Sequence, residues 1–200
     1  MTRPRPDFFE IRHFPWAQDL EKQTEAMRAE AAAVPREAFA PWPRDEEGSW
    51  LLLPFFTPTR RFEENCALCP GIVRWVDAVP LVQMATLSLL LPGGRISSHQ
   101  GFSPTVLRAH LPLVVPDAPA EVSGIKVGAA LRGWEAGRLV VFDDHLPHES
   151  FNDTGQPRLN LMFDFLRPWR FRTSRLGFLR QRLAPEGSYA RSFDRVARDR

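Results

Sequence analysis

Residues 133–165 read GWEAGRLVVFDDHLPHESFNDTGQPRLNLMFDF, and this stretch carries the pattern that decides the fold. Two apolar runs, at residues 138–142 and 158–165, stand on either side of a polar segment. Short runs rich in branched and aromatic residues, bounded by turn-forming residues, indicate β-strands. The stretch therefore predicts two strands joined by a polar connection.

The residues before this stretch continue the β pattern. Residues 81–91 (LVQMATLSLLL) form a candidate buried strand that ends at the turn formers of residues 92–94. Residues 105–115 (TVLRAHLPLVV) alternate in a way that places Arg108 and His110 on the same face of a strand.

Helical patterns are confined to the first part of the chain. Residues 17–34 are rich in strong helix formers, and Pro70 begins a second helix. Residues 50–56 (WLLLPFF) are apolar but interrupted by Pro54, which favours an edge strand. Several short strands without alternating helices predict a mainly β protein, a jelly roll (double-stranded β-helix) with peripheral helices, including an N-terminal one.

The composition is that of an ordinary globular protein. The 200 residues have a hydrophobic fraction of 44% and a charged fraction of 25%, which excludes an intrinsically disordered chain. The length suits one domain. No signal-peptide pattern begins the chain and no long uninterrupted apolar run occurs, so we expect no transmembrane segment and a cytoplasmic location.

Two other features have simple interpretations. Cys66 and Cys69 form a CxxC without a second cysteine pair, which favours two small residues packed at a helix entrance over a zinc or redox site.

From Arg167 to the end, ten arginines accompany three acidic residues. Such an end is more often a solvated helix, a docking element or an unstructured tail than a nucleic-acid site, and we expect no nucleic-acid partner. Peripheral contact with an anionic membrane is the alternative for this basic end.

Two histidines are candidate metal ligands. His99 and His148 are 49 residues apart, so only folding can bring them together. Imidazole suits iron, zinc and copper, and a mononuclear oxygenase iron usually takes two histidines and one carboxylate. The expected HxD is HxG here, because Gly101 occupies the carboxylate position. Spacing alone leaves metal ligands and ordinary surface or core histidines both open.

The chain resembles the aspartyl/asparaginyl β-hydroxylase family of iron(II)- and 2-oxoglutarate-dependent dioxygenases. The matching pieces, in order, are NCALCP, LSLLLPGGRISSHQG, LRAHLPLVVP, GWEAGRLVVFDDHLPHESFN and RLNLMFDFLRP. That family holds iron with two histidines and no carboxylate, so Gly101 fits the resemblance. It implies a single dioxygenase domain over residues 1–200, with a catalytic core at about 65–167 and a basic C-terminal extension at about 168–200.

The resemblance also implies roles for individual residues. His99 and His148 match the two iron ligands. Arg158 matches the arginine that holds the distal carboxylate of 2-oxoglutarate, with Ser88 beside it as a hydroxyl donor. A planar guanidinium can bind a carboxylate through two hydrogen bonds, which agrees with this role.

Arg108 and His110 match residues that contact the cosubstrate carboxylate at the metal end. A structural ion pair for Arg108 and a core position for His110 are the alternatives. Asp143 and Asp144 are interpreted as turn residues that support the site, and His145 as a surface residue.

Two further pairs of residues are interpreted as turn formers. Trp134 and Gly137 are expected to build the turn before a strand, with contact to the substrate as the less favoured alternative, and Asn152 and Asp153 to build the next turn.

The implied reaction is hydroxylation of an unactivated carbon with O2, giving succinate and CO2 as coproducts. We expect the substrate to be small or peptidic, with hydroxylation at the β-carbon of an Asp- or Asn-like residue in a peptide or in a free or carrier-bound amino acid. Arg60 and Arg61 are candidate contacts for a substrate carboxylate, or a solvated turn. A lipid acyl-chain hydroxylase of the same family and a non-catalytic jelly-roll binding protein are the alternatives.

Overall fold

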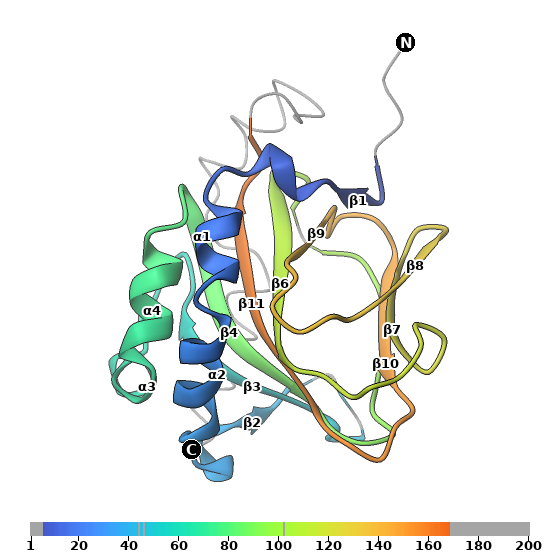
Figure 1. Ribbon diagram of the computed structural model, residues 1–200, viewed down its shortest axis with the longest axis horizontal. Helices are drawn as coiled ribbons and strands as arrows, with labels where there is room; N and C mark the ends of the chain where they lie inside the picture. The colour runs from blue at the N-terminus through green and yellow to red at the C-terminus, as the bar shows by residue number, and fades with distance from the viewer. Residues whose placement is uncertain (1–5, 44, 46, 102, 169–200) are drawn as a thin grey trace.

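The computed structural model describes residues 6–43, 45, 47–101 and 103–168, and in this part of the chain two antiparallel sheets face each other (Figure 1). The large sheet has the strand order β1-β9-β6-β11-β4-β3-β2, and the small sheet has the order β5-β10-β7-β8. The strands are β1 Phe8–Phe9, β2 Ala40–Pro41, β3 Trp50–Phe56, β4 Val82–Leu90, β5 Arg95–His99, β6 Val106–Val114, β7 Ser123–Val127, β8 Ala130–Gly133, β9 Val140–Phe142, β10 His148–Asn152 and β11 Arg158–Leu166.

The helices cover the outer face of the large sheet (Figure 1). They are α1 Ala17–Glu21, α2 Thr24–Ala32, α3 Glu63–Leu68 and α4 Pro70–Asp77, with short 3-10 turns η1 Ile11–His13 and η2 Arg36–Ala38. None of the helices in the described residues is long and apolar enough to cross a membrane.

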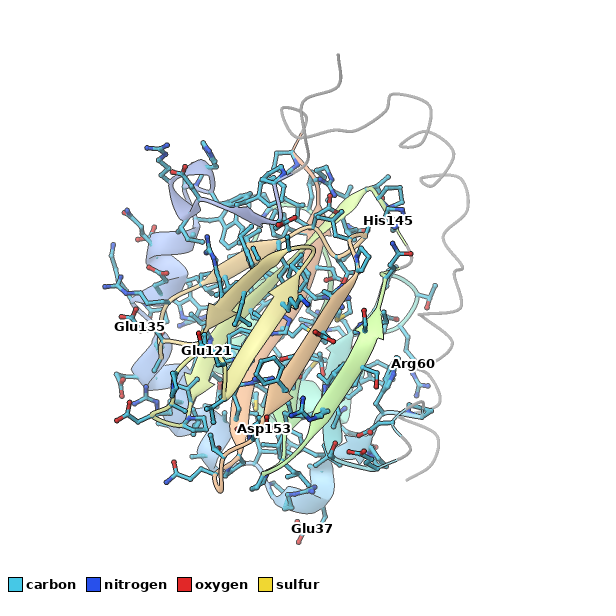
Figure 2. All side chains as sticks on the ribbon, turned by 90° about the vertical axis from the view of Figure 1, so that its right-hand side faces the viewer. Glu37, Arg60, Glu121, Glu135, His145 and Asp153 are labelled. Atoms are coloured by element: carbon cyan, nitrogen blue, oxygen red, sulfur yellow. The ribbon has the colours of Figure 1, made fainter. Side chains whose placement is uncertain are left out.

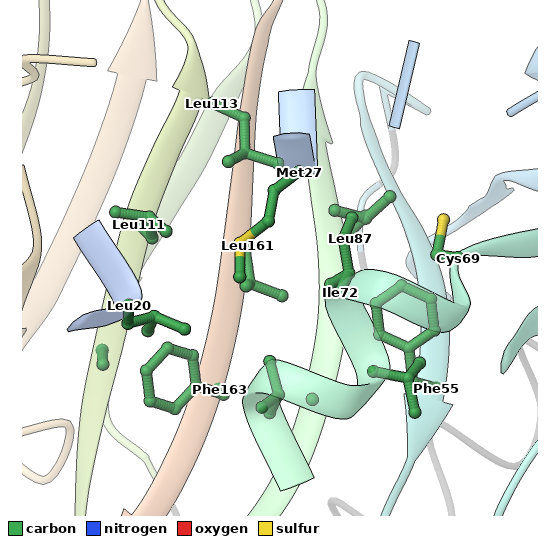
Figure 3. Packing of buried hydrophobic residues seen from close by; sticks show 14 of the residues in the cluster. Leu20, Met27, Phe55, Cys69, Ile72, Leu87, Leu111, Leu113, Leu161 and Phe163 are labelled. Carbon is green, nitrogen blue, oxygen red and sulfur yellow. The ribbon is translucent and has the colours of Figure 1, made fainter. Parts of the chain in front are cut away.

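The main core lies between these helices and the large sheet (Figure 3). Met27 of α2 and Ile72 of α4 pack against Leu87, Leu111 and Leu161, which come from three neighbouring strands. Because side chains alternate along a strand, the residues between these leucines face the small sheet instead. On β11 the alternation places Leu159, Leu161, Phe163 and Phe165 in the core and turns Arg158, Asn160, Met162 and Asp164 inward. The space between the sheets therefore receives the buried polar side chains of β11, beside apolar ones such as Ile125 and Phe142.

The predicted jelly roll is confirmed, with differences in individual elements. The helix expected over residues 17–34 is divided into α1 and α2 by a turn at Lys22–Gln23. The expected strand at residues 50–56 is β3. On its outer side β3 pairs only with the two residues of β2, Ala40 and Pro41, so most of β3 is an edge strand as predicted.

Six strands were not expected. Two are the short edge strands β1 and β2 of the large sheet, and the other four, β5, β7, β8 and β10, make up the whole small sheet. The segment interpreted as a polar connection thus contains β10, and Asn152 ends that strand. Its amide Nδ2 donates to the carbonyls of Leu91 and Gln156, at 3.2 and 2.8 Å, so it still holds the turn as predicted. Apart from its first residue, the basic extension at about 168–200 lies outside the described residues.

Candidate active site

The small sheet brings the two predicted metal ligands together. His99, the last residue of β5, is the direct cross-strand partner of His148, the first residue of β10. The centres of the two imidazole rings are 4.1 Å apart. His148 is buried and His99 is half-buried. The strand pairing thus closes the 49-residue separation in the sequence.

Each imidazole is held in the orientation that a metal ligand needs. The Nδ1 atom of His99 lies 2.8 Å from the carbonyl oxygen of Ser97, and that of His148 lies 2.9 Å from the carbonyl oxygen of Leu146. Only a protonated Nδ1 can donate to a carbonyl, so each Nε2 carries a lone pair. A backbone carbonyl behind the distal ring nitrogen is the usual support of a metal-binding histidine.

The electrostatic environment keeps both rings neutral. Burial lowers the pKa of His99 below its ordinary value, and burial together with the nearby His99 ring lowers the pKa of His148 to about 3. Neutral imidazole is the form that binds a metal. At neutral pH protons therefore do not compete for these two nitrogen atoms.

The space beside Gly101 is filled by a carboxylate from elsewhere in the chain. A Cβ atom at Gly101 would overlap the side chain of Asp144. The Gly101 amide donates to the Asp144 carbonyl at 2.7 Å, and Asp144 Oδ1 lies 3.4 Å from His148 Nε2. Within the described ranges, no group of three or more His, Cys, Asp or Glu is arranged to hold a metal. The donor set fits a metal held by two histidines, with Asp144 beside it.

Arg108 fixes this carboxylate in place. Its guanidinium lies 2.6 Å from Asp144 Oδ1 and makes two hydrogen bonds of 2.8 Å to Asp164, its cross-strand partner on β11. All three residues are buried. The structure therefore shows Arg108 in an ion-pair network, which was one of its two interpretations. A contact between Arg108 and the cosubstrate stays a prediction.

A buried arginine lies farther along β11. Arg158 donates to the carbonyl of Phe151 at 2.9 Å and to Ser150 Oγ at 2.8 Å, and its guanidinium lies 4.6 Å from the centre of the Trp134 ring. No ion pair joins it to a carboxylate in the described part of the chain. Burial lowers the pKa of Arg158 to about 9, so it remains a cation at neutral pH. A buried cation without a counter-charge is unfavourable, and an anionic ligand would offset this.

Ser88 and His110 complete the inner wall. Ser88 Oγ accepts a hydrogen bond of 2.9 Å from the indole of Trp50, which leaves its own hydroxyl proton available to a ligand. The amide of Asn160 donates to His110 Nδ1 at 3.1 Å. Burial lowers the pKa of His110 well below its ordinary value, so the ring is neutral. Arg108 and His110 share the inner face of β6, as the alternation predicted.

Several other predictions have structural outcomes. Both cysteines are buried at the junction of α3 and α4, which confirms the packing interpretation. Arg61 pairs with Asp77 at 2.8 Å, and the guanidinium of Arg60 lies over the ring of Phe62. His145, expected at the surface, is partly buried, with Nδ1 3.1 Å from the Gly101 carbonyl (Figure 2).

Some residues that shape the site were missed. Trp134 follows β8, and its ring contacts Arg158. Asp164 accepts a hydrogen bond from Arg108 and so fixes its position. The alternation along residues 158–165 contained the signal for Asp164, because it places this carboxylate on the same strand face as Arg158.

Two facing sheets with paired histidines on one and a buried arginine on the other define a double-stranded β-helix protein, with the candidate site between the sheets. An oxidoreductase of the 2OG-Fe(II) oxygenase family from Burkholderia pseudomallei shares this fold. It is 13% identical, with a TM-score of 0.54, over 76% of this chain and 82% of that one.

The family model described as aspartyl/asparaginyl beta-hydroxylase matches residues 20–168, and the chain belongs to this family. An ornithine lipid ester-linked acyl 2-hydroxylase from Rhizobium tropici is 31% identical over 82% of this chain and 61% of that protein. The human aspartyl/asparaginyl beta-hydroxylase is 28% identical over 76% of this chain and 21% of its own length. The chain thus spans about three fifths of the first relative and about one fifth of the second.

Proposed function

We propose that this protein is an iron(II)- and 2-oxoglutarate-dependent dioxygenase. The proposal rests on one observation: two histidines and a buried arginine, which are chemically different groups, face the same space between the sheets. His99 and His148 present two neutral imidazoles whose Nε2 atoms carry lone pairs, and Arg158 presents a buried cation without an acidic partner among the described residues. 2-Oxoglutarate has a matching pair of ends, a 2-oxo acid for a metal and a second carboxylate for an arginine.

Iron(II) held by His99 and His148 would supply the oxidation of an unreactive C–H bond by O2, with 2-oxoglutarate converted to succinate and CO2. The chain supplies orientation and charge. Arg158 and Ser88 bind the far carboxylate, and the ion pairs of Arg108 hold Asp144 beside the metal ligands. Arg158 and Ser88 are buried on the inner face of the large sheet, which limits the access of water to them.

The names of the relatives favour one kind of target carbon. The β-carbon of an Asp or Asn residue lies next to the side-chain carbonyl, and carbon 2 of an ester-linked acyl chain lies next to the ester carbonyl. We therefore propose that this protein hydroxylates a carbon adjacent to a carboxyl, carboxamide or ester carbonyl. The expected Asp- or Asn-like substrate and the lipid alternative are two forms of this reaction, and the 31% identity to the acyl 2-hydroxylase favours including the lipid.

An anaerobic titration tests the proposal. Iron(II) and 2-oxoglutarate together are expected to produce a visible charge-transfer band, and His99→Ala or His148→Ala is expected to abolish it while the circular dichroism spectrum is retained. Absence of the band in the wild-type protein would favour the non-catalytic binding protein instead.

Incubation with O2 and either Asp- and Asn-containing peptides or ester-linked acyl lipids, followed by mass spectrometry, then distinguishes the two substrates.

A further inference from the structure

Trp134 has an unsatisfied polar group next to the buried arginine. It follows directly after β8, and its ring centre lies 4.6 Å from the guanidinium carbon of Arg158 and 5.5 Å from the centre of the His110 ring. The side chain is only partly buried, but the indole Nε1 atom is shielded from solvent and has no hydrogen-bond partner among the described residues. Buried indole N–H groups usually have an acceptor, so this donor indicates a missing one.

The surroundings define the chemistry of the missing acceptor. Arg158 uses part of its guanidinium on Ser150 and Phe151, and no carboxylate of the described residues neutralises it. Ser88 faces the same interior with a hydroxyl proton to donate. A cation, a hydroxyl and an indole N–H are all donors, and a carboxylate can accept from all three.

We infer that Trp134 contacts the cosubstrate, donating its indole N–H to the distal carboxylate of 2-oxoglutarate while its ring holds the Arg158 guanidinium. This inference rests on the proposed function and adds a residue to it. The stacked ring restricts the guanidinium plane. The N–H gives selectivity for 2-oxo acids that carry a second carboxylate, because with other 2-oxo acids it stays buried and unpaired.

The test compares two ligands with two variants. Trp134→Phe keeps an aromatic ring over Arg158 but removes the N–H. 2-Oxopentanoate has the 2-oxo acid end of 2-oxoglutarate and a methyl group in place of the distal carboxylate. Trp75→Phe on α4, where the ring packs against the main core and beside Arg74, is the matched control. The Kd of each ligand is measured anaerobically with iron(II) from the charge-transfer band.

Trp134→Phe is expected to raise the Kd of 2-oxoglutarate by about tenfold or more, the usual size for a hydrogen bond to a charged group. The Kd of 2-oxopentanoate is expected to change less than about twofold, and Trp75→Phe is expected to change neither. Equal weakening of both ligands by Trp134→Phe would show a purely structural role and overturn the inference, as would an unchanged Kd for 2-oxoglutarate.

A second measurement uses the wild-type protein and does not depend on a folded variant. With Zn(II) in place of iron(II), the indole N–H signals of the six tryptophans are followed by NMR. One buried indole signal is expected to move downfield with 2-oxoglutarate and not with 2-oxopentanoate. No such difference would contradict the inference. If the wild-type protein gives no charge-transfer band with either ligand, the proposed function fails, whereas a band that Trp134→Phe leaves unchanged defeats only the role of Trp134.

Discussion

At the scale of single residues, the site depends on which side chain occupies the space beside Gly101. A carboxylate attached at that position would meet Asp144, which already fills the space from the other side. Asp144 in turn is held by Arg108 and lies near His148 Nε2. The absence of a side chain at Gly101 is therefore a requirement of the site, because it admits a carboxylate that the chain delivers from a different loop.

Gly101→Ala is expected to impair the site, although the substitution removes no functional side chain. The added Cβ must displace Asp144, and overpacking of this kind usually costs about 1–3 kcal/mol of stability. We expect the Kd for 2-oxoglutarate with iron(II) to rise about tenfold or more as Asp144 is displaced. Gly155→Ala is the matched control, because a Cβ there meets nothing within 4 Å. The same Kd for 2-oxoglutarate in both variants would show that the space beside Gly101 is not required by the site.

At the scale of elements, prediction from the sequence succeeded where a strand is long and buried. Residues 105–115 alternate over nine residues of β6, and the shared face of Arg108 and His110 followed directly. The strands β5 and β10 are short and largely polar, so no hydrophobic pattern identified them. Their register, which places His99 opposite His148, is set by tertiary pairing and leaves no local signal in the sequence.

The position of Trp134 shows a similar limit. The sequence GWEAG indicates a turn, and the structure has one, but a turn motif does not tell which way its aromatic side chain points. Asp144 was interpreted as a supporting residue, and the structure places it beside His148 and Arg108. That it fills the space at Gly101 depends on the approach of two loops, which only the folded chain reveals.

The α3–α4 junction makes a prediction about thiol reactivity. Burial raises the pKa of the Cys69 thiol to about 12 and also raises that of Cys66. Because the thiolate is the reactive form, both thiols are expected to react slowly with a disulfide reagent at about pH 8 in the native protein. In denaturant both cysteines of the chain are expected to react at once. Rapid labelling of one thiol in the native state would instead support a redox role for the CxxC.

The start of α4 depends on a side chain from another helix. The carboxylate of Glu30 on α2 accepts hydrogen bonds from the amides of Gly71 and Ile72, at 2.8 and 2.7 Å. Loss of such a cap usually costs about 0.5–2 kcal/mol. Glu30→Ala is therefore expected to lower the free energy of unfolding by about that amount in urea denaturation. Glu121→Ala, at an exposed position (Figure 2), is the control and should leave the stability unchanged.

At the scale of the whole molecule, the two halves of the proposed ligand site lie on different sheets. His99 and His148 belong to the small sheet, whereas Arg158 and Ser88 belong to the large one. A ligand that contacts both ends therefore connects the sheets, and it relieves the unpaired charge of Arg158 as it binds. Metal and cosubstrate should consequently stabilise the fold more together than the sum of their separate effects.

Thermal unfolding with Mn(II) in place of iron(II) tests this coupling without oxidation. A ligand present at 100 times its Kd stabilises the native state by about 2.7 kcal/mol. In a domain of this size that corresponds to a rise in Tm of about 5–10 °C. We expect such a rise with Mn(II) and 2-oxoglutarate together, and a much smaller one with Mn(II) and 2-oxopentanoate. Arg158→Met should retain the effect of Mn(II) alone and lose the additional effect of 2-oxoglutarate, because the variant keeps the histidines and lacks the cation. If 2-oxoglutarate still raised the Tm of Arg158→Met by the wild-type amount, the cosubstrate would not connect the two sheets through this arginine.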